Sequence, residues 1–62
     1  MKEYTILVKS NENKGIANKE MDDAIKMMEN GGWKIEGIQS TTEMTYGDAT
    51  MYIVSQVMKR KK

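Results

Sequence analysis

One stretch of the sequence has the periodicity of an amphipathic helix, and it limits the chain to few folds. Its apolar residues recur at the spacing i, i+3, i+4 and i+7, which puts them on one side of a helix: Met21, Ala24, Ile25 and Met28. Asn18 stands before this stripe as a predicted N-cap, and Asn30-Gly31-Gly32 follows it as a stop signal. We therefore expect a helix over residues 18–30 with one buried face.

Three further segments have the composition of β-strands, over residues 3–9, 33–46 and 49–59. Residues 10–15 are polar and predict a loop between the first strand and the helix. In the second segment the apolar alternation slips at Gly37. A glycine at such a slip predicts a β-bulge, which would return Ile38 to the core face.

The last two strands are predicted to form one hairpin. Gly47-Asp48 is an acceptable two-residue turn, and it pairs Tyr46 with Ala49 and Met44 with Met51. A flexible loop over residues 40–48 is the alternative.

These elements give an α+β fold of the order β-α-β-β in a single domain over residues 1–62. The last strand is apolar on both faces, which is typical of a central strand. It therefore favours a split βαβ arrangement with the strand order first-third-second. A right-handed crossover between neighbouring first and second strands is the alternative. The basic tail, residues 59–62, is expected to be disordered.

One helix covers only one face of such a sheet. We expect Leu7, Tyr52, Val54 and Met58 to lie on the other face, which leaves more apolar surface exposed than a lone monomer tolerates. A chain of 62 residues buries only about 60% of its unfolded surface, and without cysteine it forms no disulfide. The sequence therefore predicts a homodimer, with the four residues in its interface.

The composition argues against an enzyme. The chain has no histidine and no cysteine, so it lacks the usual general base near neutral pH, the commonest metal ligand and the thiol nucleophile. Asp22 and Asp23 are adjacent on the predicted helix and point about 100° apart, so they cannot share a proton. Gly31-Gly32 follows a helix, whereas phosphate-binding glycine loops precede one. We expect no enzymatic activity, no cofactor and no bound metal.

The net charge of +1 and the short apolar run Ile6-Leu7-Val8 predict a cytoplasmic protein without a membrane partner. The four basic residues at the C-terminus, Lys59, Arg60, Lys61 and Lys62, are candidate phosphate contacts. With Tyr4, Tyr46 and Tyr52 as stacking surfaces they suggest nucleic-acid binding, but a charged tail that keeps the sheet soluble explains the same residues.

Two features concern protein partners. Trp33 follows the helix and is expected to anchor it to the sheet, with a partner contact as the alternative. The chain contains seven methionines, a residue type that fills cores and is also over-used on adaptable binding surfaces.

Three short motifs are shared with a family of proteins: Lys2-Glu3-Tyr4, the run from Met28 to Ile35 with its Gly-Trp pair, and Tyr52-Ile53-Val54 before the basic C-terminus. In these the chain resembles a domain-of-unknown-function family of short bacterial and phage-borne proteins. The resemblance implies a small αβ domain with no established catalytic residues. It also suggests an accessory protein of a phage or mobile element that binds a host protein.

The sequence thus favours a non-enzymatic protein-interaction module that forms a homodimer through an open sheet face. The alternative is a small nucleic-acid-binding protein that uses the basic tail and the sheet tyrosines.

Overall fold

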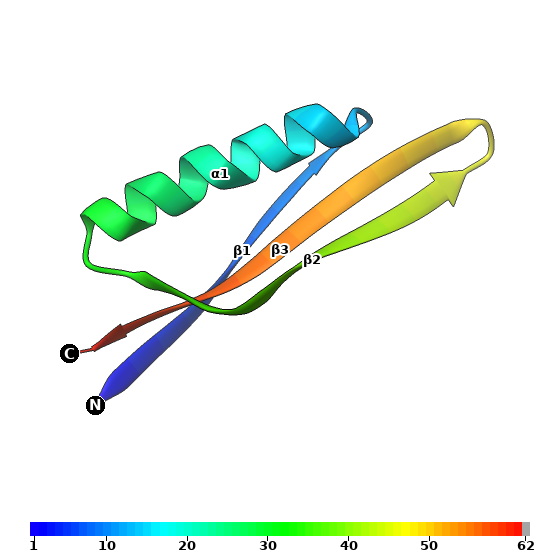
Figure 1. Ribbon diagram of the computed structural model, residues 1–62. Helices are drawn as coiled ribbons and strands as arrows, with labels where there is room; N and C mark the ends of the chain where they lie inside the picture. Colours follow the sequence, from blue (N-terminus) through cyan, green and yellow to red (C-terminus); the bar gives the residue numbers. More distant parts are fainter. Residues whose placement is uncertain (62) are drawn as a thin grey trace.

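The computed structural model describes residues 1–61 and contains one helix and three strands (Figure 1). In chain order these are β1 (Lys2–Asn11), α1 (Lys14–Asn30), β2 (Lys34–Tyr46) and β3 (Ala49–Lys61). The predicted β-α-β-β fold is therefore confirmed. The predicted disorder of the basic tail is wrong for residues 59–61, which continue β3, while Lys62 lies outside the described residues.

The strands form one sheet in the order β1-β3-β2, and β3 pairs antiparallel with both neighbours. This is the predicted split arrangement, and the alternative with β1 beside β2 is excluded. β3 carries apolar residues on both faces, as is typical of a central strand. Both of its edges are paired, one with β1 and the other with β2. The start of β1 and the end of β3 lie side by side, with Lys2 opposite Lys61 (Figure 1).

The hairpin of β2 and β3 has the predicted register. Tyr46 lies opposite Ala49, and Met44 lies opposite Met51. Gly47 has a φ of +57°, a conformation that glycine adopts without steric cost. The alternative of a flexible loop over residues 40–48 is therefore wrong, since β2 runs to Tyr46.

The bulge in β2 is present, but it does not do what the sequence predicts for Ile38. The register shifts between Glu36 and Ser40, around Gly37 with its φ of +79°. Glu36 lies opposite Val57 and Ser40 lies opposite Ser55, so three residues of β2 span one residue of β3. Two extra residues leave the alternation of the strand unchanged, and they push Ile38 outward until 93% of its surface is exposed.

Helix α1 begins four residues before the predicted start. Its N-cap is Asn13, whose side chain accepts a hydrogen bond from the Ile16 backbone N–H at 3.1 Å. Asn18, the predicted N-cap, lies inside the helix. The added turn extends the apolar stripe to Ala17, which is fully buried. The predicted end at Asn30 is confirmed, because the backbone N–H groups of residues 31–33 turn back to the last carbonyls of the helix.

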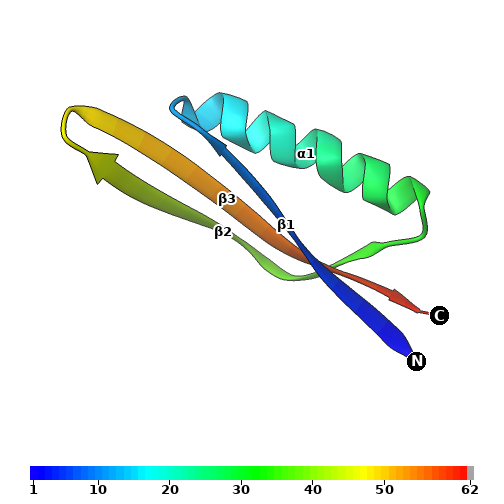
Figure 2. The ribbon, with the colours of Figure 1, turned by 180° about the vertical axis from the view of Figure 1, so that it is seen from behind.

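The core lies between α1 and the face of the sheet that carries the even-numbered residues of β3. Its fully or nearly buried members are Ala17, Met21, Ile25, Val54 and Met58, with Leu7, Met28, Trp33 and Tyr52 packed around them. The predicted assignment of Leu7, Tyr52, Val54 and Met58 to the uncovered face is therefore wrong. The helix covers the face that these four share, and the opposite face is open. Both views show α1 on one side of the sheet only (Figure 2).

The position of the N-cap gives a direct test of the helix start. Replacing Asn13 with alanine removes a side-chain acceptor from the first turn, so we expect the free energy of unfolding to decrease by about 1 kcal/mol. The matched control, Asn18→Ala, introduces a better helix former and should leave stability unchanged within about 0.5 kcal/mol. Urea denaturation followed by circular dichroism measures both. A larger loss for Asn18→Ala than for Asn13→Ala would contradict the observed start.

Candidate functional site

The side of the sheet away from α1 is apolar over most of its length. We call this side the open face. In β1 it presents Tyr4, Ile6 and Val8, which are 59%, 63% and 57% exposed. The neighbouring strands contribute further apolar side chains to it: Met51, Ile53 and Val57 from β3, and Met44 from β2.

Cross-strand pairing joins these side chains into one patch. Ile6 lies opposite Val57, and Met44 lies opposite Met51. Directly opposed residues on one face contact each other. Between these two pairs Ser55 lies opposite Val8 and Ser40, and Ile53 lies opposite Thr42, so small polar side chains interrupt the apolar ones in the middle of the patch. No described element packs on it. An apolar patch of this extent on a small soluble domain is typical of an interaction surface.

The open face ends in a group of basic residues beside the chain termini. Lys2 lies opposite Lys61, and Lys34 lies opposite Lys59. With Gly32 and Arg60 these four lysines line a hollow of about 280 Å³, which we call the basic hollow. The register of the sheet therefore brings together residues from the beginning, middle and end of the chain.

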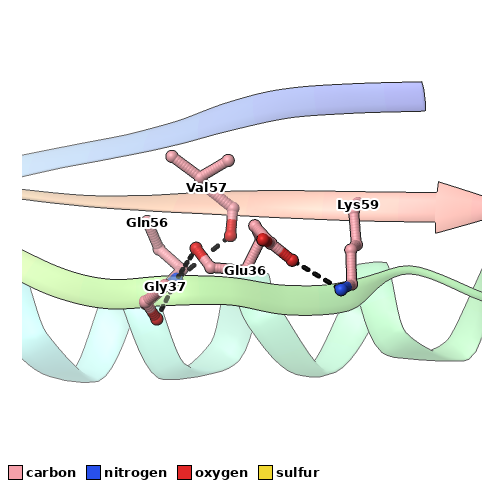
Figure 3. A network of polar contacts seen from close by, with 5 residues as sticks. All are labelled: Glu36, Gly37, Gln56, Val57 and Lys59. Carbon is pink, nitrogen blue, oxygen red and sulfur yellow. Dashed lines mark hydrogen bonds and ion pairs between the residues drawn. The ribbon is translucent and has the colours of Figure 1, made fainter. Parts of the chain in front are cut away.

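Two of the cations in the basic hollow are held by carboxylates. The Lys59 Nζ lies 2.6 Å from the Glu36 Oε2 (Figure 3). This contact lowers the pKa of Glu36 below its ordinary value of 4.5 and raises the pKa of Lys59 above 10.5, through a hydrogen bond and charge attraction. Arg60 donates two hydrogen bonds to the Glu3 Oε1, from Nε at 3.1 Å and from Nη2 at 2.8 Å.

Trp33 connects the core to the basic hollow. Its ring packs against the buried residues, in the position expected of an anchor for the end of α1. The Arg60 guanidinium lies 4.6 Å from the centre of the ring, within the range of a cation–π contact. Because Glu3 and Trp33 both hold Arg60, its side chain is fixed at the wall of the hollow.

The backbone of the bulge in β2 is hydrogen-bonded by Gln56, a residue that is only 2% exposed. The Gln56 Nε2 donates to the carbonyl oxygens of Glu36 at 3.3 Å, Gly37 at 3.4 Å and Val57 at 3.0 Å (Figure 3). The bulge takes two of these carbonyls out of the regular ladder, and Gln56 supplies the missing donor. Gln56 thereby holds the segment of β2 that carries Glu36, whose ion-pair partner Lys59 lies on β3.

The sequence pattern identified only part of this arrangement. It singled out Lys59, Arg60, Lys61 and Lys62 as a tail, and the structure places the first three in a paired strand. Lys2 and Lys34 were missed, because they are remote in sequence and become neighbours only through the strand register. Tyr46 lies at the far end of the sheet and Tyr52 lies on the helix side. Of the three tyrosines predicted to act as stacking surfaces, only Tyr4 lies next to the hollow, on the open face and opposite Lys59.

In the described part of the chain, no group of three or more acidic residues is placed to hold a metal ion. Asp22 and Asp23 are both exposed on α1. Within residues 1–61, no helix is long and apolar enough to cross a membrane.

No family model, curated protein or solved structure matches the chain.

The role of Gln56 can be tested by truncation. Gln56→Ala leaves carbonyls of the bulge without their donor in a buried position, so we expect a loss of about 1–3 kcal/mol in the free energy of unfolding. Gln39→Ala makes the same chemical change within the bulge but removes no buried hydrogen bond, and it should change stability by about 0.5 kcal/mol or less. Chemical denaturation measures the difference, and equal losses in the two variants would contradict the role given to Gln56.

Proposed function

We propose that this chain is a non-enzymatic protein-interaction module that forms a homodimer through its open face. The observation that carries the proposal is the exposed, largely apolar face of a sheet whose other side is already covered by α1. In β1, Tyr4, Ile6 and Val8 each keep more than half of their surface in solvent. A second copy is an occupant of matching character, because two identical faces bury their apolar side chains against each other, while the hydroxyl groups of the serines and the threonine between them both donate and accept hydrogen bonds.

The size of the open face fits a modest dimer. Outside the basic hollow, β3 contributes residues 49–57, nine residues that span roughly 30 Å at about 3.3 Å per residue, and three strands are about 14 Å wide. Two such faces bury on the order of 800 Å², below the area of stable specific complexes and in the range of weak, transient ones. The proposal therefore implies a dimer that dissociates on dilution into the micromolar range.

Charge determines how the two copies lie. With strands of the two sheets running in the same direction, the lysines of the two basic hollows would face each other. A two-fold axis across the strands places the hollows at opposite ends of the dimer, and it brings each one near the hairpin turn of the other copy, where Asp48 is exposed. Repulsion between like charges thus favours the antiparallel arrangement.

The absence of histidine and cysteine supports the non-enzymatic part of the proposal, because neither side chain is there to titrate or react near neutral pH. The resemblance to small phage-borne proteins agrees with an accessory role. A host target stays a hypothesis that depends on that resemblance alone.

Sedimentation equilibrium over a dilution series tests the dimer. Ile6→Glu places a charge in the middle of the patch, so we expect the dissociation constant of the dimer to increase at least about tenfold. Met27→Glu is the matched control, since Met27 is 76% exposed on α1, outside the patch, and receives the same charge.

The control variant should dimerise like the parent protein, and both variants should keep the parent circular dichroism spectrum. A parent protein that sediments as a monomer up to millimolar concentration would overturn the proposal. So would an equal effect of the two substitutions.

A further inference from the structure

The basic hollow contains an electrostatic arrangement that the fold does not require. Lys2 and Lys61 lie directly opposite each other, and so do Lys34 and Lys59. Like charges in directly opposed positions of a sheet destabilise it. Among residues 1–61, the two ion pairs involve Lys59 and Arg60, so neither of them includes Lys2, Lys34 or Lys61, and Glu36 attracts Lys2 only at longer range.

The hollow is also where the positive charge of the molecule gathers. Five of the ten basic residues line it, and two carboxylates, Glu3 and Glu36, offset part of their charge. The local net charge is +3 in a chain with a net charge of +1, so the rest of the molecule is acidic. A concave site with one sign of charge concentrates ligands of the opposite sign.

The dimensions of the hollow suit more than one anionic group. Its cations are spaced about 5 Å across the strands and about 6.6 Å along β3. Gly32 has no side chain, and a Cβ atom placed there would have the Arg60 Cδ at 4.0 Å as its nearest neighbour, so that wall is open. Several lysines around an open hollow match a chain of phosphates better than a single small anion.

An aromatic surface adjoins the cations. Tyr4 is 59% exposed on the open face and lies opposite Lys59 in the register of β1 and β3. Sites for single-stranded nucleic acid combine a positive groove for the backbone with exposed aromatic rings on which unpaired bases stack. Trp33 does not serve this purpose, because it packs against the core and carries Arg60 on its ring.

We propose that the basic hollow binds the phosphates of single-stranded nucleic acid, with Lys2, Lys34 and Lys61 as the backbone contacts and Tyr4 as the stacking surface. The bound phosphates would offset the repulsion between the opposed lysines. Each copy contains the whole hollow, and in the antiparallel dimer the two hollows lie at opposite ends. Tyr4 also belongs to the open face, so its ring is available for stacking in the monomer, and the second copy and the nucleic acid compete for it.

Fluorescence anisotropy of a labelled 12-nucleotide oligothymidylate tests the proposal. Three phosphate contacts predict a decrease in affinity of roughly 20-fold between 50 and 200 mM salt. In the triple variant Lys2→Gln, Lys34→Gln and Lys61→Gln we expect the affinity to fall at least about tenfold and the salt dependence to become nearly flat. The matched control changes three exposed lysines of α1 in the same way: Lys14→Gln, Lys19→Gln and Lys26→Gln.

The control has the same net charge as the triple variant and should retain binding within about twofold if the position of the lysines matters. Thermal denaturation without ligand adds a second readout. Removing the opposed charges should keep or raise the melting temperature of the triple variant, although its binding is lost. Equal losses of affinity in both triple variants, or no binding by the parent protein at 50 mM salt, would overturn the proposal.

Two further arms distinguish the source of the phosphates. Tyr4→Leu should weaken binding of the oligonucleotide at least about fivefold and leave its salt dependence unchanged. Tripolyphosphate should compete poorly, because it offers charge without bases. Equal competition by tripolyphosphate, or an unchanged affinity in Tyr4→Leu, would exclude the nucleic acid and leave a small oligophosphate as the ligand. Repeating the titration with Met44→Glu, which places the charge at the far end of the open face, separates this site from the dimer. The monomer should bind at least as tightly per chain as the parent protein, because Tyr4 is then uncovered.

Discussion

The structure depends on the packing of one helix against one face of a three-stranded sheet. Ala17, Met21 and Ile25 of α1 meet Val54 and Met58 of β3, and these are the buried apolar side chains of the core. β3 also carries apolar residues on its opposite face, and α1, which lies on one side of the sheet (Figure 2), leaves that face uncovered. The exposed apolar patch is therefore a direct consequence of this packing rather than a separate feature of the surface.

Much of the fold was predictable because it depends on local patterns. The two-sided apolar alternation of β3 indicated a central strand, and Gly47-Asp48 fixed the hairpin register that pairs Met44 with Met51. The choice of face was not predictable in the same way. Both faces of β3 carry apolar residues, so the decision depends on which side packs best with the helix stripe. That stripe extends back to Ala17, and Asn18 offered a capping signal as good as that of Asn13.

The candidate sites show the same division between local and long-range information. The basic C-terminus is visible as a run of charge, but its partners Lys2 and Lys34 reach it only through antiparallel pairing with β3. Ile38 was misplaced because the number of extra residues in a bulge determines the phase that follows it. The open face thus has an apolar part proposed to bind a second copy and a basic end proposed to bind phosphates. Gln56 stabilises the bulge of β2, which lies between the apolar part and the basic end of this face.

The most direct test of this account uses the methionines as reporters of the two faces. Their methyl groups, observed by NMR with a soluble paramagnetic agent, report exposure to solvent as line broadening. In dilute protein, the account predicts strong broadening for Met27, intermediate broadening for Met44 and Met51, and weak broadening for the core residues Met21 and Met58. At high protein concentration, Met44 and Met51 should become protected while Met27 stays broadened. Broadening of Met44 and Met51 that does not change with concentration would contradict the account, as would stronger broadening of Met58 than of Met51.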